Sequence, residues 1–262
     1  MKRGIAVLLS VVLACAAAGC SEKSASSPAA TEASTTRATT TAEVKFTYEI
    51  DPSMPVIALT FDDGPNTTTT NDVLDKLAKY GVRASFFLIG SNINDDSAKS
   101  VKRAFDMGCE IDNHSQTHSY MTGMTAEQIQ AELAFTDEKV RAITGEGTRF
   151  SRPPYIAVNQ TMFDSIDLPF IAGIGANDWV VSVTPDERAQ RILDQVKDGS
   201  IILLHDAAGN YQTVEALDIL IPALSERGYQ FATVSELFAA KGIKPGADTD
   251  IVYSNALQTA MY

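Results

Sequence analysis

The sequence predicts an α/β fold, a distorted and incomplete (β/α) barrel of about seven strands with helices outside. Short apolar runs alternate with helical patterns about seven times, and such alternation is typical of parallel strands. Nearly every unusual polar side chain follows one of these runs, as expected where barrel loops converge on one mouth. These positions are Asp62-Asp63, His114, Arg152, Asp178-Trp179 and His205. No glycine-rich phosphate loop follows any run, which disfavours a nucleotide-binding sheet.

Seven short apolar runs bounded by turn residues are the expected strands. In chain order they are residues 56–61, 84–89, 109–111, 148–152, 169–174, 201–204 and 229–234. The first run leads directly into Asp62-Asp63 and a Gly64-Pro65 turn. Because adjacent residues of an extended chain point to opposite sides, the two carboxylates are expected to have different partners and different roles.

Helical patterns lie between or after these runs. They cover residues 69–80, 97–107, 125–144, 159–165, 184–197 and 213–227, with a short last helix from Ser235. Gly81 stands where a C-cap glycine belongs, and Thr125 with Gln128 forms a capping-box pattern. Pro222 lies inside the sixth helix, where we expect a kink. The tail beyond Lys241 is weakly patterned.

The first 45 residues are expected to lie outside the folded domain, which would cover 46–262. Two basic residues precede an apolar run over 5–18 that is too short for a comfortable membrane span, and small residues precede Cys20. This pattern predicts a signal peptide over 1–20. Its Gly-Cys end resembles a bacterial lipoprotein signal in which Cys20 carries the lipid; plain secretion is the alternative. Residues 21–45 are rich in Ser, Thr and Ala and predict a flexible tether. We therefore expect an extracytoplasmic protein, anchored to the cell membrane by lipid or secreted.

The composition limits the choice of partner. The 262 residues are 45% hydrophobic, which suits one sizeable domain with a real core. Residues 46–262 hold 16 Lys/Arg and 30 Asp/Glu, so a nucleic-acid partner or an anionic membrane surface is not expected. Cys15 lies in the signal and Cys20 would be lipidated, which leaves Cys109 without a disulfide partner in the mature domain.

The three histidines of the chain, His114, His118 and His205, all follow predicted strand ends. A spacing of four places the imidazoles of His114 and His118 on one side of a turn. Two histidines and one carboxylate form a metal set that leaves positions open for water and substrate, and Asp63 is the expected third ligand. The alternatives are two surface histidines, and acids at a strand end that cap the next helix.

Five motifs in order resemble those of the polysaccharide deacetylase family, the NodB-like carbohydrate esterases of family 4. They are Thr60-Phe61-Asp62-Asp63-Gly64-Pro65, His114-Ser115-Gln116-Thr117-His118, Arg152-Pro153-Pro154-Tyr155, Asp178-Trp179 and Leu203-Leu204-His205-Asp206. The resemblance covers roughly residues 54–240. It implies the distorted barrel of the NodB-homology fold, a divalent metal held by Asp-His-His, and removal of acetyl groups from sugars. Zinc is the first choice of metal, with cobalt, manganese or nickel as alternatives.

Chemistry and the resemblance together assign roles to the other motif residues. Asp62, the acid that does not bind metal, would take a proton from water as general base, and Arg152 would pair with it. In the family the backbone amide at the Tyr155 position helps to hold the oxyanion. His205 is the candidate general acid, and Asp178 would orient its imidazole and raise its pKa.

The acetyl pocket is expected to be walled by Trp179 and Leu204, for which core packing is the alternative. Departures from the family pattern occur at Asp112 and Ile156, where many members have glycine, and at Gly175, where an acid is common. These positions line the same mouth and bear on which sugar fits. The segments 152–159 and 175–179 look similar to clostridial acetylxylan esterases of this family, which favours an ester substrate.

The expected function is metal-dependent deacetylation of an extracellular carbohydrate polymer. Its partner would be an acetylated polysaccharide or oligosaccharide: O-acetylated xylan, or N-acetylglucosamine polymers such as peptidoglycan or chitin. The alternatives are an inactive carbohydrate-binding protein on the same scaffold and a barrel glycosidase that uses Asp62 with another acid. Every proposed catalytic position carries a competent residue type, and a His-His-Asp metal set has no use in a glycosidase.

Overall fold

The computed structural model describes residues 45–46, 48–246 and 249–260. The predicted signal peptide, Cys20 and nearly all of the predicted tether therefore lie outside the described residues. Among the helices that are described, none is both long enough and apolar enough to span a membrane.

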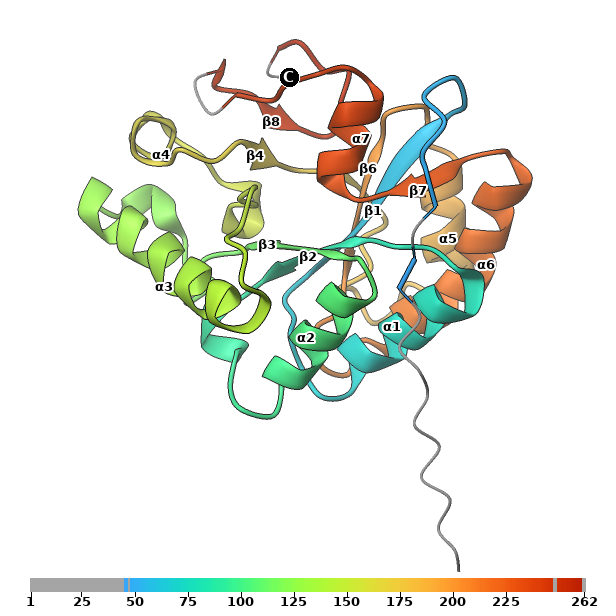
Figure 1. Ribbon diagram of the computed structural model, residues 1–262, viewed down its shortest axis with the longest axis horizontal. Coiled ribbons are helices and arrows are strands. Elements are labelled where there is room, and N and C mark those ends of the chain that lie inside the picture. Colours follow the sequence, from blue (N-terminus) through green and yellow to red (C-terminus); the bar gives the residue numbers. More distant parts are fainter. Residues whose placement is uncertain (1–44, 47, 247–248, 261–262) are drawn as a thin grey trace, which may run out of the picture. The chain divides into compact units, whose positions relative to one another are not determined.

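A parallel sheet built around β1 forms the centre of the domain (Figure 1). The strands are β1 (Val56–Asp62), β2 (Ser85–Leu88), β3 (Glu110–Asn113), β4 (Phe170–Ile171), β5 (Ile174–Gly175), β6 (Ile201–His205), β7 (Gln230–Ala232) and β8 (Val252–Tyr253). The order is β3-β2-β1-β6-β5, and β7 pairs in parallel with the first half of β1. Every residue of β1 is buried, and β1 lies between β2 and β6. Asp62 and Asp63 therefore stand at the carboxyl end of a central strand.

Beyond β3 the ring of strands continues through Ser151, β4 and β5 and returns to β6, which fits the predicted distorted barrel. Ser151 bridges Asn113 at the end of β3 to Phe170 in β4, and β5, which begins three residues after the end of β4, pairs with β6. The predicted strand over 169–174 is thus divided into β4 and β5. Gly173 lies between them, and a Cβ atom there would stand only 2.7 Å from the Cβ of Leu203. The glycine allows this segment to cross close to β6.

The predicted strand over 148–152 is reduced to the single bridge at Ser151. One carboxylate oxygen of Asp112 in β3 accepts hydrogen bonds from the backbone N–H groups of Arg149 and Phe150, both at 3.1 Å. A side chain therefore occupies donors that a neighbouring strand would otherwise use. The prediction of a regular strand was wrong here, and β8 in the tail was not predicted.

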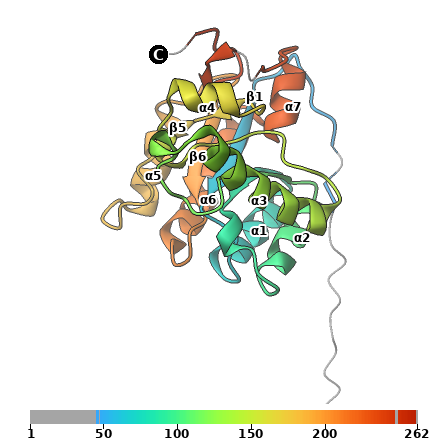
Figure 2. The same cartoon turned by 90° about the vertical axis from the view of Figure 1, so that its left-hand side faces the viewer.

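In the described part of the chain, seven α-helices surround the strands, as Figures 1 and 2 show. They are α1 (Thr69–Tyr80), α2 (Ala98–Asp106), α3 (Ala126–Thr144), α4 (Gln160–Ser165), α5 (Pro185–Leu193), α6 (Tyr211–Glu226) and α7 (Val234–Ala240). Contacts between helices run in the order α5, α6, α1, α2, α3, α4. Gly81 ends α1 in the left-handed conformation, and Thr125 with Gln128 forms the predicted capping box of α3.

The alternation of side chains along β1 decides where the first carboxylate points. Ile57, Leu59 and Phe61 belong to the large core cluster between the sheet and the helices. Thr60 and Asp62 therefore face the opposite way, toward the inside of the ring of strands. Both are buried, which places an acid at the inner carboxyl end of the central strand.

Candidate active site

The carboxylate of Asp63 and the imidazoles of His114 and His118 converge at the mouth of the sheet. Asp63 Oδ1 lies 3.5 Å from His114 Nε2 and 3.3 Å from His118 Nε2. One ligand atom from each of the three residues lies within 4.8 Å of the others. The three positions predicted from their spacing and strand ends are thus brought together in a set that suits a divalent cation.

The chemical state of these atoms fits a cation. His114 Nδ1 lies 2.6 Å from the backbone oxygen of Arg152 and must donate to it, so Nε2 is the ring nitrogen that is left to bind a cation in the site. Asp63 Oδ1 is buried without a hydrogen-bond partner among the described residues. Lone pairs that face one another in a buried place need a positive charge between them. Burial lowers the pKa of His118, which favours the neutral ring that a metal requires.

Backbone conformations of uncommon type are concentrated at this mouth. Asp63, His118 and Tyr155 have φ angles of 73°, 56° and 61°, in the left-handed region that non-glycine residues rarely adopt. Of the other described non-glycine residues with positive φ, only Asp250 lies away from the mouth; the rest are Ser115, Ile156 and Asn177. Such conformations cost roughly 1–3 kcal/mol each and persist where the surroundings enforce them, often at functional sites.

Asp62 and Arg152 form a buried ion pair next to the metal set. One terminal nitrogen of the guanidinium donates to Asp62 Oδ1. The other donates to Thr60 Oγ1 at 2.9 Å and to the backbone oxygen of Ala172 at 2.6 Å. Asp62 Oδ2 lies 3.8 Å from His114 Nε2, so the arginine fixes one carboxylate oxygen while the other faces the site.

A second acid–base pair joins His205, the last residue of the neighbouring strand β6, to Asp178 in the turn after β5. Asp178 is completely buried, and its carboxylate lies 2.8 Å from His205 Nδ1 and accepts from the His205 backbone N–H at 2.7 Å. Burial alone would lower the pKa of His205, but the hydrogen bond and charge of Asp178, with the charges of Asp62 and Asp63, raise it to about 9. The imidazole is therefore protonated at neutral pH and can give up a proton.

The metal set, Asp62 and His205 open into one cavity of about 660 Å3, while Arg152 and Asp178 are buried behind its wall. Asp62, Asp63, His114, His118 and His205 line it, together with Tyr155, Ile156, Gly173, Gly175, Asn177, Trp179 and Leu203. The cavity is large enough for a sugar unit and combines apolar walls with a few convergent polar groups, as binding sites do.

Leu204 is the one predicted pocket residue that the structure places elsewhere. It belongs to the core cluster under the helices, whereas its neighbour Leu203 lines the cavity. Because side chains alternate along β6, the residue that shares the inner face with His205 is the one two positions before it. The prediction for Leu204 was therefore wrong by one residue, and Leu203 takes its place.

Several residues that support the site were not predicted. Thr213 donates to Asp178 at 2.8 Å, and the buried Arg188 in turn donates to Thr213 at 2.9 Å. Tyr120 stacks on Tyr155 with 4.0 Å between ring centroids. Thr213 and Arg188 lie on predicted helices with nothing in their spacing to distinguish them. Tyr120 lies two residues after His118, close enough to that motif to offer a local signal.

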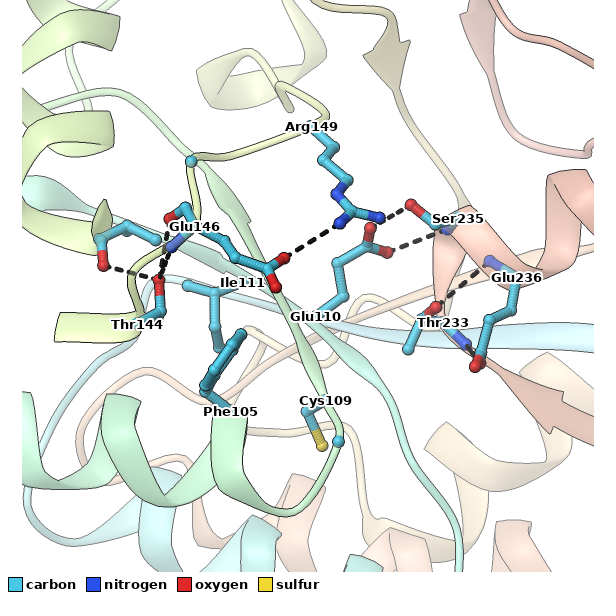
Figure 3. Close-up of a pocket in the computed structure, with 13 residues that line it drawn as sticks. Phe105, Cys109, Glu110, Ile111, Thr144, Glu146, Arg149, Thr233, Ser235 and Glu236 are labelled. Atoms are coloured by element: carbon cyan, nitrogen blue, oxygen red, sulfur yellow. Dashed lines mark hydrogen bonds and ion pairs between the residues drawn. The ribbon is translucent and has the colours of Figure 1, made fainter. Parts of the chain in front are cut away.

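A smaller cavity of about 200 Å3 lies at the other end of β3 (Figure 3). There the carboxylate of Glu110 accepts from Ser85 Oγ and from the backbone N–H of Ser235, both at 3.0 Å. Burial raises the pKa of the nearby Cys109 thiol to about 12, so this free cysteine stays protonated and unreactive. These contacts hold the start of α7 against β2 and β3, which is a structural role.

Comparison with known proteins gives the family. A family model described as polysaccharide deacetylase matches residues 49–167. The family 4 acetyl xylan esterase from Clostridium thermocellum, solved in complex with a cobalt ion, is 42% identical with a TM-score of 0.76. The alignment covers 78% of this chain and 100% of that one. The chain belongs to the polysaccharide deacetylase family.

Curated relatives of this chain act on two kinds of polymer, according to their names. The bifunctional xylanase/deacetylase of Pseudobutyrivibrio xylanivorans is 50% identical over 75% of this chain and 32% of its own length. The peptidoglycan-N-acetylmuramic acid deacetylase of Bacillus subtilis is 34% identical over 73% of this chain and 40% of its own. The chain thus matches a third to two fifths of each of these longer relatives. The resemblance inferred from the five motifs is confirmed.

Proposed function

We propose that this polysaccharide deacetylase is a metal-dependent esterase that removes O-acetyl groups from an extracellular polysaccharide, with acetylated xylan as the first candidate. The observation that carries the proposal is the convergence in one cavity of a cation-binding set, a buried carboxylate and a protonated imidazole. Each alone is common in proteins, but hydrolysis of an acetyl group needs all three kinds of group together.

Asp63, His114 and His118 are the residues we propose as metal ligands. Zinc is the proposed ion, with cobalt, manganese or nickel as alternatives, and the cobalt complex of the clostridial relative supports a divalent metal. A cation bound there would supply a Lewis acid for the acetyl carbonyl and lower the pKa of a water molecule.

The remaining steps are assigned to side chains and one amide of this chain. Asp62 Oδ2, the oxygen not fixed by Arg152, takes the proton of the attacking water as general base. The backbone N–H of Tyr155 is the proposed donor to the oxyanion that forms from the carbonyl. His205, held by Asp178, then gives its proton to the departing sugar oxygen, so that the ester bond breaks and acetate leaves.

Xylan is favoured over peptidoglycan because the similarity is greater to the xylanase/deacetylase, at 50% identity, than to the peptidoglycan enzyme, at 34%. In an N-acetyl substrate the same imidazole would protonate an amine instead of a hydroxyl oxygen. The N-acetyl polymers peptidoglycan and chitin are therefore the second candidates, at the same site and with the same residues.

Location outside the cytoplasm, with a lipid on Cys20, is part of the proposal. It rests on the N-terminal sequence pattern, and a tether would let the domain reach a polymer away from the membrane. Mass spectrometry of the mature protein tests it: a diacylglycerol-modified Cys20 at the N-terminus supports the anchor, and an unmodified start farther along the chain overturns it.

Acetate release is the experiment that tests the proposed reaction. The protein is incubated with acetylated xylan, chitin oligomers and peptidoglycan, with and without a chelator, and acetate and reducing sugar are measured. Acetate from xylan that disappears with chelator is the expected result. Release of no acetate from any polymer would favour a binding protein without activity, and reducing sugar without acetate would favour a glycosidase.

A further inference from the structure

A groove continues sideways from the catalytic cavity. Its volume is about 390 Å3, and it shares the residues Asp63, Trp179 and His205 with the cavity. Val181 and Tyr211 extend it beyond these shared residues. We call it the Tyr211 groove, defined by Trp179, Val181, Arg188, Tyr211 and the loop 207–210. A ligand bound in this groove would therefore lie next to the substrate group in the catalytic cavity.

Three large apolar side chains on the walls of the Tyr211 groove are exposed to solvent. Trp179 is 59% exposed, Val181 83% and Tyr211 50%. Exposed apolar side chains that gather on one surface mark a binding site more often than chance. Two of the three are aromatic rings, which offer flat apolar faces with little conformational entropy to lose on binding.

Arg188 holds the two walls in place from beneath. Its guanidinium donates to the backbone oxygens of Val183 at 2.9 Å and Val180 at 3.2 Å, on the wall that carries Val181. The same group donates to the side-chain oxygens of Asn210 and Gln212, both at 2.7 Å, on either side of Tyr211 in the chain. These contacts cross between the starts of α5 and α6, which lie side by side (Figures 1 and 2). A buried charge with this many fixed partners keeps the groove open in one shape.

We propose that the Tyr211 groove binds a pyranose unit of the polysaccharide, next to the unit that is deacetylated. The apolar face of the sugar ring would lie against Tyr211 and Trp179, and the chain of sugars would pass over His205 into the cavity. The choice of ligand rests on the proposed function, because continuity with the catalytic cavity is what points to a neighbouring unit of the same polymer. Tyr211 is then a specificity residue that selects long chains over single sugars.

A binding measurement tests the groove without any need for turnover. Trp179 is the only tryptophan of the chain and lies in the groove, so its fluorescence reports ligands there. Xylo-oligosaccharides and N-acetylglucosamine oligomers of one to five units are titrated into the protein in the presence of chelator. We expect a fluorescence change whose affinity rises with chain length. Tyr211→Ala should weaken binding of the longer oligomers about two- to tenfold, the range for one aromatic contact.

Two control variants distinguish loss of the Tyr211 ring from a general effect of substitution on α6. Tyr211→Phe retains the ring and should bind like the unchanged protein, and so should Ile219→Ala, which removes an exposed apolar side chain from the same helix α6 but outside the groove. Thermal unfolding of all variants checks that the fold is intact. If a folded Tyr211→Ala protein binds every oligomer as tightly as the unchanged protein, the groove is not a sugar site.

Turnover measurements distinguish a failure of this proposal from a failure of the proposed function. Tyr211→Ala should raise KM for acetylated oligosaccharides and leave hydrolysis of a small aryl acetate unchanged. Normal acetate release with no effect of Tyr211→Ala on either KM or binding overturns the groove and leaves the function standing. Length-dependent binding that requires Tyr211, without acetate release from any substrate, overturns the function and leaves the sugar site standing.

Discussion

Arg152 and Asp62 form an ion pair that is almost entirely removed from water: the arginine is 0% exposed and the aspartate 2%. The guanidinium also donates to Thr60, two residues before Asp62 on the same face of β1. A buried carboxylate is stable as an anion only when such partners compensate for lost hydration. The pair therefore fixes the carboxylate of Asp62 with one oxygen on Arg152 and the residue lining the cavity, which is the position that a general base would need.

Asp62→Asn should lower kcat by about 100- to 10,000-fold, the usual contribution of a positioned base. Asparagine keeps the shape and can still accept from Arg152 but cannot take a proton. KM and the amount of bound metal should change little. Acetate release under saturating substrate and metal content by atomic absorption provide the test. Turnover within a factor of about three of the unchanged protein would assign the base to another residue.

The sequence predicted the metal set because its signal is local. Two histidines four residues apart, and an acid directly after an apolar run, are visible without knowledge of the fold. Asp63 and His114 directly follow β1 and β3, and His118 lies in the loop after β3. The boundaries of α1 and α3 followed for the same reason, since the Gly81 cap and the box of Thr125 with Gln128 are determined by adjacent residues. The helix predicted over 184–197 instead ends at Leu193, where no such cap stands.

What the sequence did not reveal depends on contacts between distant segments. The support of Asp178 by Thr213 and Arg188 joins segments that are 35 and 25 residues apart through side-chain oxygens. The loss of the strand over 148–152 comes from Asp112, far away in the chain. The exchange of Leu204 for Leu203 is different, because counting two residues back from His205 would have predicted it.

Removal of the metal ligands should abolish activity together with metal binding. Asp63→Ala and His118→Ala should each lose the bound ion and lower kcat/KM at least about 100-fold, because several kcal/mol of transition-state stabilisation depend on a Lewis acid. Chelated protein should show the same loss and recover when zinc or cobalt is added. His205→Ala is the control: it should be inactive but retain the metal. Full activity after exhaustive chelation would rule out metal dependence.

Asp178→Asn should shift the alkaline limb of the pH–activity profile to lower pH. The pKa of His205 is about 9 because its hydrogen bond and charge interaction with Asp178 outweigh the opposing effect of burial. His205 must be protonated to act as an acid, so activity should fall as pH rises through that pKa. A neutral asparagine removes the main favourable interaction, and the limb should move toward the ordinary histidine pKa of 6.5. Asp186→Asn, an exposed acid in the first turn of α5, should leave the profile unchanged, and an unshifted limb in Asp178→Asn would mean that another group is the acid.

Asp206→Asn should stabilise the metal-free protein at neutral pH. Burial, and the negative charges of Asp63 and Asp62, raise the pKa of Asp206 to about 7 from 3.8, although Thr70 donates to its carboxylate. The native state then binds a proton that the unfolded state has released, so stability falls as pH rises from about 4 to about 7. The asparagine has no such proton, and its gain over the unchanged protein should grow across this range to at most about 4 kcal/mol.

Denaturant unfolding with chelator present, from pH 4 to pH 7.5, measures this difference. Asp218→Asn is a control of opposite sign: despite burial, hydrogen bonds from Lys76 and Lys79 lower the pKa of Asp218, so its ionised form stabilises the native state above the unfolded pKa. That variant should be less stable than the unchanged protein by a nearly constant amount from pH 7.5 to pH 4, and should approach it only below the unfolded pKa of 3.8. If the stability curves of Asp206→Asn and the unchanged protein run parallel from pH 4 to 7.5, Asp206 is ionised in the native state throughout, and the buried acid beside the metal set carries a full negative charge.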